Sequence, residues 1–170
     1  MQKQEEFYVN SRFNFGAFLS SSFLSDCELR IYNSGDDITT IRAHRYVLSN
    51  SSHFFFNIFT SGMQEESTGI VVMKKNPDNM LQKVIRWMYD GEIRFDWEDV
   101  VALLEISQYY SIPQLNSDVM KFLDTNINEK NVLVLVRKCY ELELDDILDD
   151  ILNDYLALFF RKIPIQELSD

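Results

Sequence analysis

The stretch of residues 42–66, RAHRYVLSNSSHFFFNIFTSGMQEE, constrains the fold of this chain most strongly. It begins as the end of an extended segment, continues through an apolar helix and ends in a short polar loop that carries Met63 and Glu65. A phenylalanine-rich helix needs a core to cover it, whereas a polar loop stays in water. The stretch therefore predicts a packed core followed by an exposed, chemically specific tip, which is typical of a protein that binds other proteins.

The charge of the chain excludes several classes of partner. Lys and Arg number 16 against 27 Asp and Glu, which gives a formal charge of −11 at pH 7. A phosphate backbone or an anionic membrane surface would be repelled by such a chain. No run approaches the ~18 apolar residues of a membrane-spanning helix, and the N-terminus lacks the apolar core of a signal peptide. We therefore expect no nucleic-acid or membrane partner, and a cytoplasmic or nuclear location.

Length and hydrophobic patterning predict one main domain that contains a β-hairpin. A chain of 170 residues with 46% hydrophobic content can bury enough apolar surface to offset the entropy of ordering. Apolar and polar residues alternate from Cys27 to Tyr32, and a β-branched run from Ile38 to Ala43 follows the turn residues 33–36. This pattern predicts a hairpin with one buried face.

The rest of the main domain has mainly helical periodicity. Residues 48–59 predict two short helices with a serine-rich joint, residues 60–69 a loop and residues 70–73 a short buried strand. Asn76-Pro77 and Gly91 bound a further helix, and Pro113 begins a later one. In the helix that begins after Asp96, the predicted buried stripe is Val100, Leu103, Leu104 and Ser107.

The two ends of the chain have weaker patterns. Residues 1–12 are an N-terminal extension that fits either a short strand or a loose terminus. Residues 13–24 fit an imperfect amphipathic helix, and residues 126–170 predict a C-terminal helical pair. Together with the hairpin, these elements predict an α+β fold.

No pattern typical of an enzyme or a metal site occurs in the sequence. There is no GxGxxG, phosphate loop, HExxH or Gly-x-Ser-x-Gly motif, and the acidic run that begins at Glu141 lacks the spacing of a calcium loop. Cys27 and Cys139 lie far apart in the sequence, which predicts two buried reduced thiols. His44 and His53 are predicted to be structural. We expect a non-enzymatic protein without catalytic residues, cofactor or bound metal.

Several motifs in order resemble the BTB/POZ domain family over about residues 13–125. They are Ser25-Asp26-Cys27-Glu28-Leu29, Ala43-His44-Arg45-Tyr46-Val47-Leu48-Ser49, Ser52-His53-Phe54-Phe55, Met63-Gln64-Glu65, Met88-Tyr89-x-Gly91 and Val100-x-x-Leu103-Leu104. Cys27 stands where the family has Val, and the N-terminal helix is poorer in Leu than in strongly dimerising members. The resemblance implies the BTB/POZ fold, a short mixed sheet packed against a helical cluster. Residues 126–170 are similar to the helical pair, the start of a BACK-like region or 3-box, that follows the domain in cullin adaptors.

The resemblance also implies a binding surface for the N-terminal region of cullin-3. In the family, the loop that matches Met63 and Glu65 inserts its apolar residue into a groove on cullin-3, while the Glu accepts hydrogen bonds. Tyr110 matches a family Tyr on the same face. Phe56 is assigned to this surface as well, although Phe56 and Tyr109 could equally belong to the core.

Two further sites are expected nearer the N-terminus. A homodimer would form through the N-terminal helix, because its aromatic side chains are too much apolar surface to leave in water; they are Phe13, Phe15, Phe18 and Phe23. Asp26 and Arg45 form either a charged pocket that recognises a peptide, as in transcriptional family members, or an ordinary buried polar anchor.

Two function classes follow from these features. One is an adaptor, as a homodimer, that recruits an unknown substrate protein to a cullin-3 RING ubiquitin ligase. The other is an oligomerisation or scaffolding domain of a transcriptional regulator or cytoskeletal protein that does not bind cullin. Nothing in these residues resembles a kelch, zinc-finger or MATH module, so the sequence does not identify a substrate.

Overall fold

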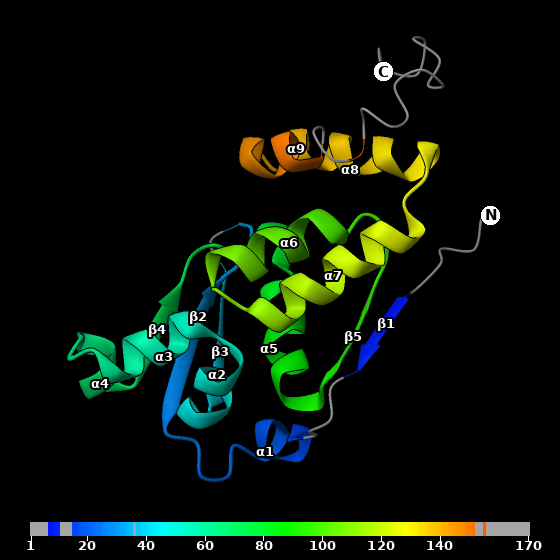
Figure 1. Ribbon diagram of the computed structural model, residues 1–170. Coiled ribbons are helices and arrows are strands. Elements are labelled where there is room, and N and C mark those ends of the chain that lie inside the picture. The colour runs from blue at the N-terminus through cyan, green and yellow to red at the C-terminus, as the bar shows by residue number, and fades with distance from the viewer. Residues whose placement is uncertain (1–6, 11–14, 36, 152–154, 156–170) are drawn as a thin grey trace.

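The computed structural model describes residues 7–10, 15–35, 37–151 and 155, and it contains a three-stranded mixed sheet (Figure 1). The central strand β2 (Cys27–Tyr32) is antiparallel to β3 (Ile38–Ala43) and parallel to β4 (Ile70–Met73). Leu29 is fully buried and its neighbour Arg30 is exposed, so one face of the sheet packs on the core. The predicted hairpin and the predicted α+β fold with a mixed sheet are confirmed.

A single extended residue separates the two helices that follow the sheet hairpin. Ser52 lies between α2 (Arg45–Ser51) and α3 (His53–Thr60), with φ −144° and ψ 126°. Its hydroxyl donates to the Tyr110 carbonyl at 2.6 Å and accepts the Phe55 N–H at 3.2 Å. A buried hydroxyl needs such partners, and these two connect α3 to the centre of the molecule. The predicted pair of short helices with a serine joint is confirmed.

Helices α5 (Leu81–Asp90), α6 (Val100–Tyr109) and α7 (Pro113–Asn126) form the centre of the core. A 3₁₀ helix, η1 (Pro77–Asn79), precedes α5, and the Asn76 side chain accepts the Leu81 N–H at 2.9 Å. Gly91 ends α5 in the left-handed conformation, with φ 74°. The predicted buried stripe of α6 is confirmed; its members are Val100, Leu103, Leu104 and Ser107.

The N-terminal extension contributes a strand to a second, smaller sheet. Strand β1 (Phe7–Asn10) is antiparallel to β5 (Glu92–Phe95), and Phe7 lies opposite Phe95 in the register. This pair lies apart from the three-stranded sheet, on the other side of α5 (Figure 1). Of the two conformations that fit the sequence of the extension, residues 7–10 adopt the strand.

Helices α8 (Glu129–Glu141) and α9 (Asp145–Ile151) lie across α6 at one end of the molecule (Figure 1). The Asn128 side chain caps α8 by accepting the N–H groups of Lys130 and Asn131. Lys138 Nζ lies 2.9 Å from Asp78 Oδ2, which ties α8 to η1. The structure describes the predicted second helix as far as Ile151.

Three of the described helices differ from the prediction. Helix α5 begins at Leu81 and not at Asn76-Pro77, where η1 lies instead. Helix α1 (Gly16–Ser21) is shorter than residues 13–24, because Ser22 adopts a left-handed backbone with φ 53° that ends the helix before Phe23. Helix α4 (Gln64–Thr68) lies within residues 60–69, so the predicted loop was wrong for these five residues. Acidic residues in the first turn of α4 and the left-handed Gly69 after its last turn favour a helix there.

Candidate functional site

The connection between α3 and α4 presents Met63 to solvent. Met63 is 53% exposed and is the N-cap residue of α4, with an extended backbone and no capping hydrogen bond from its side chain. A flexible thioether side chain adapts to the shape of a groove and gains free energy when its apolar surface leaves water. The position therefore suits a side chain that fills an apolar groove on a partner.

The two glutamates that follow Met63 have different surroundings. Glu66 Oε2 accepts the Gly62 N–H at 2.6 Å, so this carboxylate closes the start of α4. The Glu65 side chain is half-buried, and its carboxylate makes no hydrogen bond or ion pair with any residue that the structure describes. Its oxygens can accept charge-assisted hydrogen bonds from a partner. The structure thus separates a structural Glu66 from an available Glu65.

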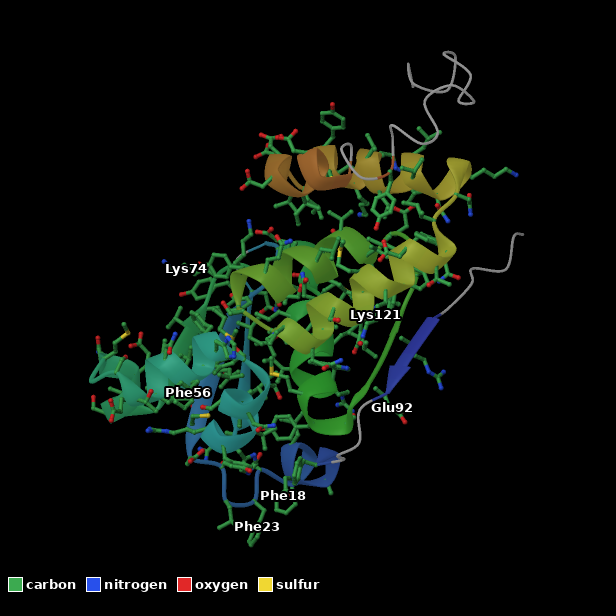
Figure 2. All side chains as sticks on the ribbon, viewed as in Figure 1. Phe18, Phe23, Phe56, Lys74, Glu92 and Lys121 are labelled. Atoms are coloured by element: carbon green, nitrogen blue, oxygen red, sulfur yellow. The ribbon has the colours of Figure 1, made fainter. Side chains whose placement is uncertain are left out.

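Two exposed aromatic rings extend this surface along α3. Phe56 on α3 is 52% exposed (Figure 2), and Tyr109 at the end of α6 is 56% exposed. The His53 N–H donates to the Ser111 carbonyl at 3.0 Å, so the end of α6 lies beside the first turn of α3. Helix α3 is about 12 Å long, and Met63 follows its last turn. We define the binding surface as Met63, Glu65, Phe56 and Tyr109.

Tyr110 does not belong to the exposed surface. It is 1% exposed, its hydroxyl donates to the Lys75 carbonyl at 2.9 Å, and burial raises its pKa above the usual range. Its ring lies edge-on to Phe54 and to Tyr109, with centroids 5.1 and 4.9 Å away. Tyr110, which was expected on the binding surface, is therefore buried and cannot contact a partner directly in this conformation. Its ring packs against Tyr109, which is the exposed residue of the two. The sequence does contain a signal for the burial of Tyr110, because this residue follows the buried Ser107 by three positions and so continues the buried stripe of α6.

Asp26 and Arg45 contact each other through backbone atoms. The Asp26 carboxylate accepts the Arg45 backbone N–H at 2.8 Å, and Arg45 Nε donates to the Asp26 carbonyl at 3.2 Å. Arg45 Nη1 donates to the Glu66 carbonyl at 2.8 Å, and its guanidinium lies 5.2 Å from the centroid of the Phe59 ring. Of the two interpretations of this pair, these contacts favour the polar anchor over the peptide pocket. The contact with Glu66 has no signal in the sequence.

Only part of the aromatic group expected on the N-terminal helix lies on α1. Phe13 lies outside the described residues, and Phe15 is a half-buried residue packed against the core. Phe18 is 42% exposed on α1, and Phe23, beyond the helix, is 61% exposed. Figure 2 shows Phe18 and Phe23 together beside α1 and apart from Phe56 on α3. The exposed rings of Phe18 and Phe23 therefore lie on α1 and on the loop after it. We call these two residues the aromatic patch, and it is separate from the binding surface.

His44 has a structural place between α5 and the loop that follows α1. Its Nε2 lies 2.7 Å from the Phe23 carbonyl, and its Nδ1 lies 3.0 Å from the Tyr89 hydroxyl. Because a carbonyl can only accept, Nε2 carries a proton and donates to Phe23. The ring also lies edge-on to Phe18, with centroids 6.0 Å apart. The structural interpretation of His44 is confirmed.

Both cysteines are buried free thiols, as predicted. Burial raises the pKa of Cys27 to about 12, to which the neighbouring Asp26 charge contributes, and burial raises the pKa of Cys139 to about 11. These thiols remain protonated near neutral pH, where the reactive form is the thiolate. They are therefore core residues with little nucleophilic character.

Neither a cluster of metal-binding side chains nor a membrane-spanning helix occurs within the described ranges. No group of three or more His, Cys, Asp and Glu side chains there could hold a metal ion. No helix there is long and apolar enough to cross a membrane.

The sequence matches the family model of the BTB/POZ domain over residues 15–127. Kelch-like protein 7 of Homo sapiens is 26% identical over 132 residues, which are 76% of this chain and 22% of the relative. Kelch repeat and BTB domain-containing protein 4 of Homo sapiens is 28% identical over 90 residues, 53% of this chain and 17% of the relative. BTB/POZ domain-containing protein 6 of Homo sapiens is 31% identical over 97 residues, 57% of this chain and 18% of the relative. The chain thus spans about a fifth of the length of these curated relatives.

Proposed function

Because the chain belongs to the BTB/POZ domain family and is a protein-interaction module, we propose that it acts as a substrate adaptor of a cullin-3 RING ubiquitin ligase. In this proposal the binding surface engages the N-terminal region of cullin-3. Met63 fills an apolar groove, and the Glu65 carboxylate accepts hydrogen bonds that set the register. The adaptor carries out no chemical step, since its task is to bring a target protein to the ligase.

One observation carries this proposal: Met63 is exposed at the start of α4, two residues before a carboxylate that has no partner among the described residues. The exposed ring of Phe56 lies on the adjoining helix α3, and the exposed ring of Tyr109 lies at the end of α6 beside the first turn of α3, so apolar rings and a charged acceptor lie on neighbouring elements. Well-packed central anchors, aromatic ones above all, dominate the affinity of protein interfaces, and a charge-assisted hydrogen bond beside them adds geometric specificity. The resemblance to the family supplies the identity of the partner.

Titration calorimetry of the chain against the purified N-terminal region of cullin-3 tests this function. We expect saturable binding with a negative heat-capacity change, because apolar surface is buried. Absence of binding at about 50 μM, a Kd too weak for a standard interface, would reject the adaptor function in favour of the scaffolding alternative.

We also propose that the adaptor is a homodimer that associates through the aromatic patch around α1. Phe18 and Phe23 are exposed there, and a hollow of about 310 Å³ beside them is lined in part by Phe15, Tyr46 and Trp87. Exposed rings next to a partly apolar hollow support self-association, since a two-fold interface can place the rings of each chain against the other. Separation of this patch from Met63 leaves the binding surface free in a dimer.

Replacing both Phe18 and Phe23 with Glu should convert the protein to a monomer. In light scattering at about 20 μM we expect the wild type to have twice the 20.1-kDa chain mass and the double variant to have the single mass. The matched control is Phe56→Glu, which replaces a phenylalanine of similar exposure outside the patch with the same residue and should remain dimeric. A monomeric wild type, or a double variant that stays dimeric, would contradict this interface.

The scaffolding alternative shares the dimer and lacks the cullin contact. It is favoured by the same exposed rings of Phe18 and Phe23, which act in oligomerisation whatever the Met63 surface does. A dimeric wild type that does not bind cullin-3 is the combination of results that would establish it.

A further inference from the structure

We propose that Arg45 is a positioning residue that holds α4 in the conformation in which Met63 and Glu65 are presented. The identity of the ligand of this loop rests on the proposed function, whereas the effect of Arg45 on α4 is a property of the free chain. Arg45 acts through α4 and does not itself contact the partner. The contacts between Asp26 and Arg45 are thereby assigned to the shape of the binding surface.

The Arg45 side chain starts on α2 and joins three other segments. Nη1 donates to the carbonyl of Glu66 in α4, and Nε donates to the carbonyl of Asp26 just before β2, at 2.8 and 3.2 Å. The guanidinium lies over the ring of Phe59 in α3, 5.2 Å from its centroid. The Asp26 carboxylate holds the Arg45 backbone N–H at 2.8 Å, so the base of the side chain is fixed as well. One side chain therefore sets the position of α4 relative to α2, α3 and the sheet.

Helix α4 has little else to hold it in place. It contains five residues, none of them buried, and a helix of this length is unstable in water without tertiary contacts. Its N-cap residue Met63 makes no capping hydrogen bond, and the bond from Gly62 to the Glu66 carboxylate lies within the loop itself. Among the residues that the structure describes, the Arg45 contact with the Glu66 carbonyl is thus the hydrogen bond that attaches the middle of α4 to the folded core.

Gly69 shows how closely α4 approaches the Arg45 side chain. A Cβ at Gly69 would lie 3.0 Å from Arg45 Nη2 and 3.0 Å from the Asp26 carbonyl oxygen. The Gly69 carbonyl accepts the Glu28 N–H at 2.8 Å, so the chain cannot move away without losing its contact with β2. Gly35 also has a positive φ, but a Cβ there would meet nothing within 4 Å. The close approach is therefore particular to Gly69.

The geometry requires an arginine and not merely a positive charge. Arg presents several N–H donors in a fixed planar fork that can also stack on an aromatic ring, whereas Lys carries one compact ammonium group. A lysine at position 45 can satisfy one of the two carbonyls, of Asp26 or Glu66, but cannot bridge both while covering Phe59. We expect Arg45→Lys to lose most of the positioning effect.

Amide exchange in the free protein, measured by NMR, tests the effect on α4 directly. In Arg45→Ala the amides of Glu66 and Gly69 should exchange at least about tenfold faster, because α4 opens locally more often. The amide of Gly91 is the internal reference, since it also ends a helix with a positive φ and donates to the Trp87 carbonyl at 2.8 Å. Its exchange should change by less than about twofold.

Matched variants separate the contact from general effects of substitution. Arg42→Ala removes the same side chain from an exposed site on β3, where it makes no hydrogen bond or ion pair with described residues, and should leave the Glu66 amide unchanged. Gly69→Ala keeps Arg45 but places a Cβ 3.0 Å from both Arg45 Nη2 and the Asp26 carbonyl oxygen, and should accelerate exchange at Glu66. Gly35→Ala also places a side chain at a positive φ, without a contact within 4 Å, and should leave exchange at Glu66 unchanged. If Arg45→Ala fails to fold, the two glycine variants decide the result.

Unchanged exchange at Glu66 in folded Arg45→Ala, or in Gly69→Ala, would overturn the proposal. Calorimetry with the N-terminal region of cullin-3 adds a second arm, in which Arg45→Ala should bind at least about tenfold more weakly than wild type and Arg42→Ala equally well. Equal binding of Arg45→Ala despite faster exchange would also overturn it. If the wild type does not bind, the proposed function fails by itself, and the amide exchange still decides whether Arg45 holds α4.

Discussion

Replacing Met63 with Asp should weaken binding to the N-terminal region of cullin-3 by at least about 30-fold, a loss of roughly 2 kcal/mol or more. The proposed contact places the Met63 side chain, 53% exposed in the free chain, in an apolar groove, where a carboxylate would lose its hydration without gaining a partner. Calorimetry on wild type and variant measures the difference. Intact binding by Met63→Asp would show that the interface lies elsewhere.

The stability of this variant should not fall, which separates a binding defect from a folding defect. Met63 is the N-cap residue of α4 and provides no side-chain cap, whereas Asp is among the preferred N-cap residues. The melting temperature should therefore stay the same or rise. Tyr140→Asp is the matched control, because Tyr140 is 66% exposed on α8 and gains the same charge away from the binding surface.

Glu65→Ala should lose about 1–3 kcal/mol of binding, since donors on the partner would be left unpaired.

Replacing Phe55 with Ala should lower the free energy of unfolding by about 3–5 kcal/mol, which corresponds to a drop in melting temperature of about 6–20 °C. Phe55 is fully buried, and its ring stacks on Phe59 and lies edge-on to Phe54, with centroids 6.1 and 5.4 Å away. Truncation leaves a cavity between α3 and the core that these rings cannot fill. Denaturant unfolding followed by circular dichroism measures the loss.

The adjacent residue is a matched control with the opposite expectation. Phe56 is 52% exposed, so Phe56→Ala should change the free energy of unfolding by no more than about 0.5 kcal/mol. It should instead weaken cullin-3 binding by about fivefold or more, the effect of losing about 1 kcal/mol at an interface. Two neighbouring phenylalanines would then separate folding from binding. Equal stability of Phe55→Ala and wild type would contradict the packing of α3.

Several elements were predictable because their signals lie between close neighbours in the chain. Alternation from Cys27 to Tyr32 and again in the run that ends at Ala43 identified the hairpin, since a two-residue period leaves only one face to bury. Gly91 and Pro113 marked helix boundaries through their own backbone preferences. The order of short motifs identified the family that the comparison with family models shows.

The candidate site was predictable at one of its ends and not at the other. Met63 and Glu65 could be chosen because they follow a phenylalanine-rich helix in a polar stretch and match a motif of the family. Which of Tyr109 and Tyr110 faces solvent depends on how α6 packs against α3, and the structure exposes Tyr109 and buries Tyr110. Both residues are tyrosines, so composition at these positions could not separate them.

What the sequence determined by itself is most of the elements and their order, because periodicity, caps and turn residues act within a few positions of one another. Only the tertiary structure decided how those elements hold the exposed loop. Arg45 reaches Asp26 and Glu66, which lie 19 and 21 positions away in the sequence, and no local pattern links these three residues. Helix α4 forms for the same reason: five residues, none of them buried, are too few to be a helix alone, and contacts made by distant segments supply the free energy that their own sequence lacks.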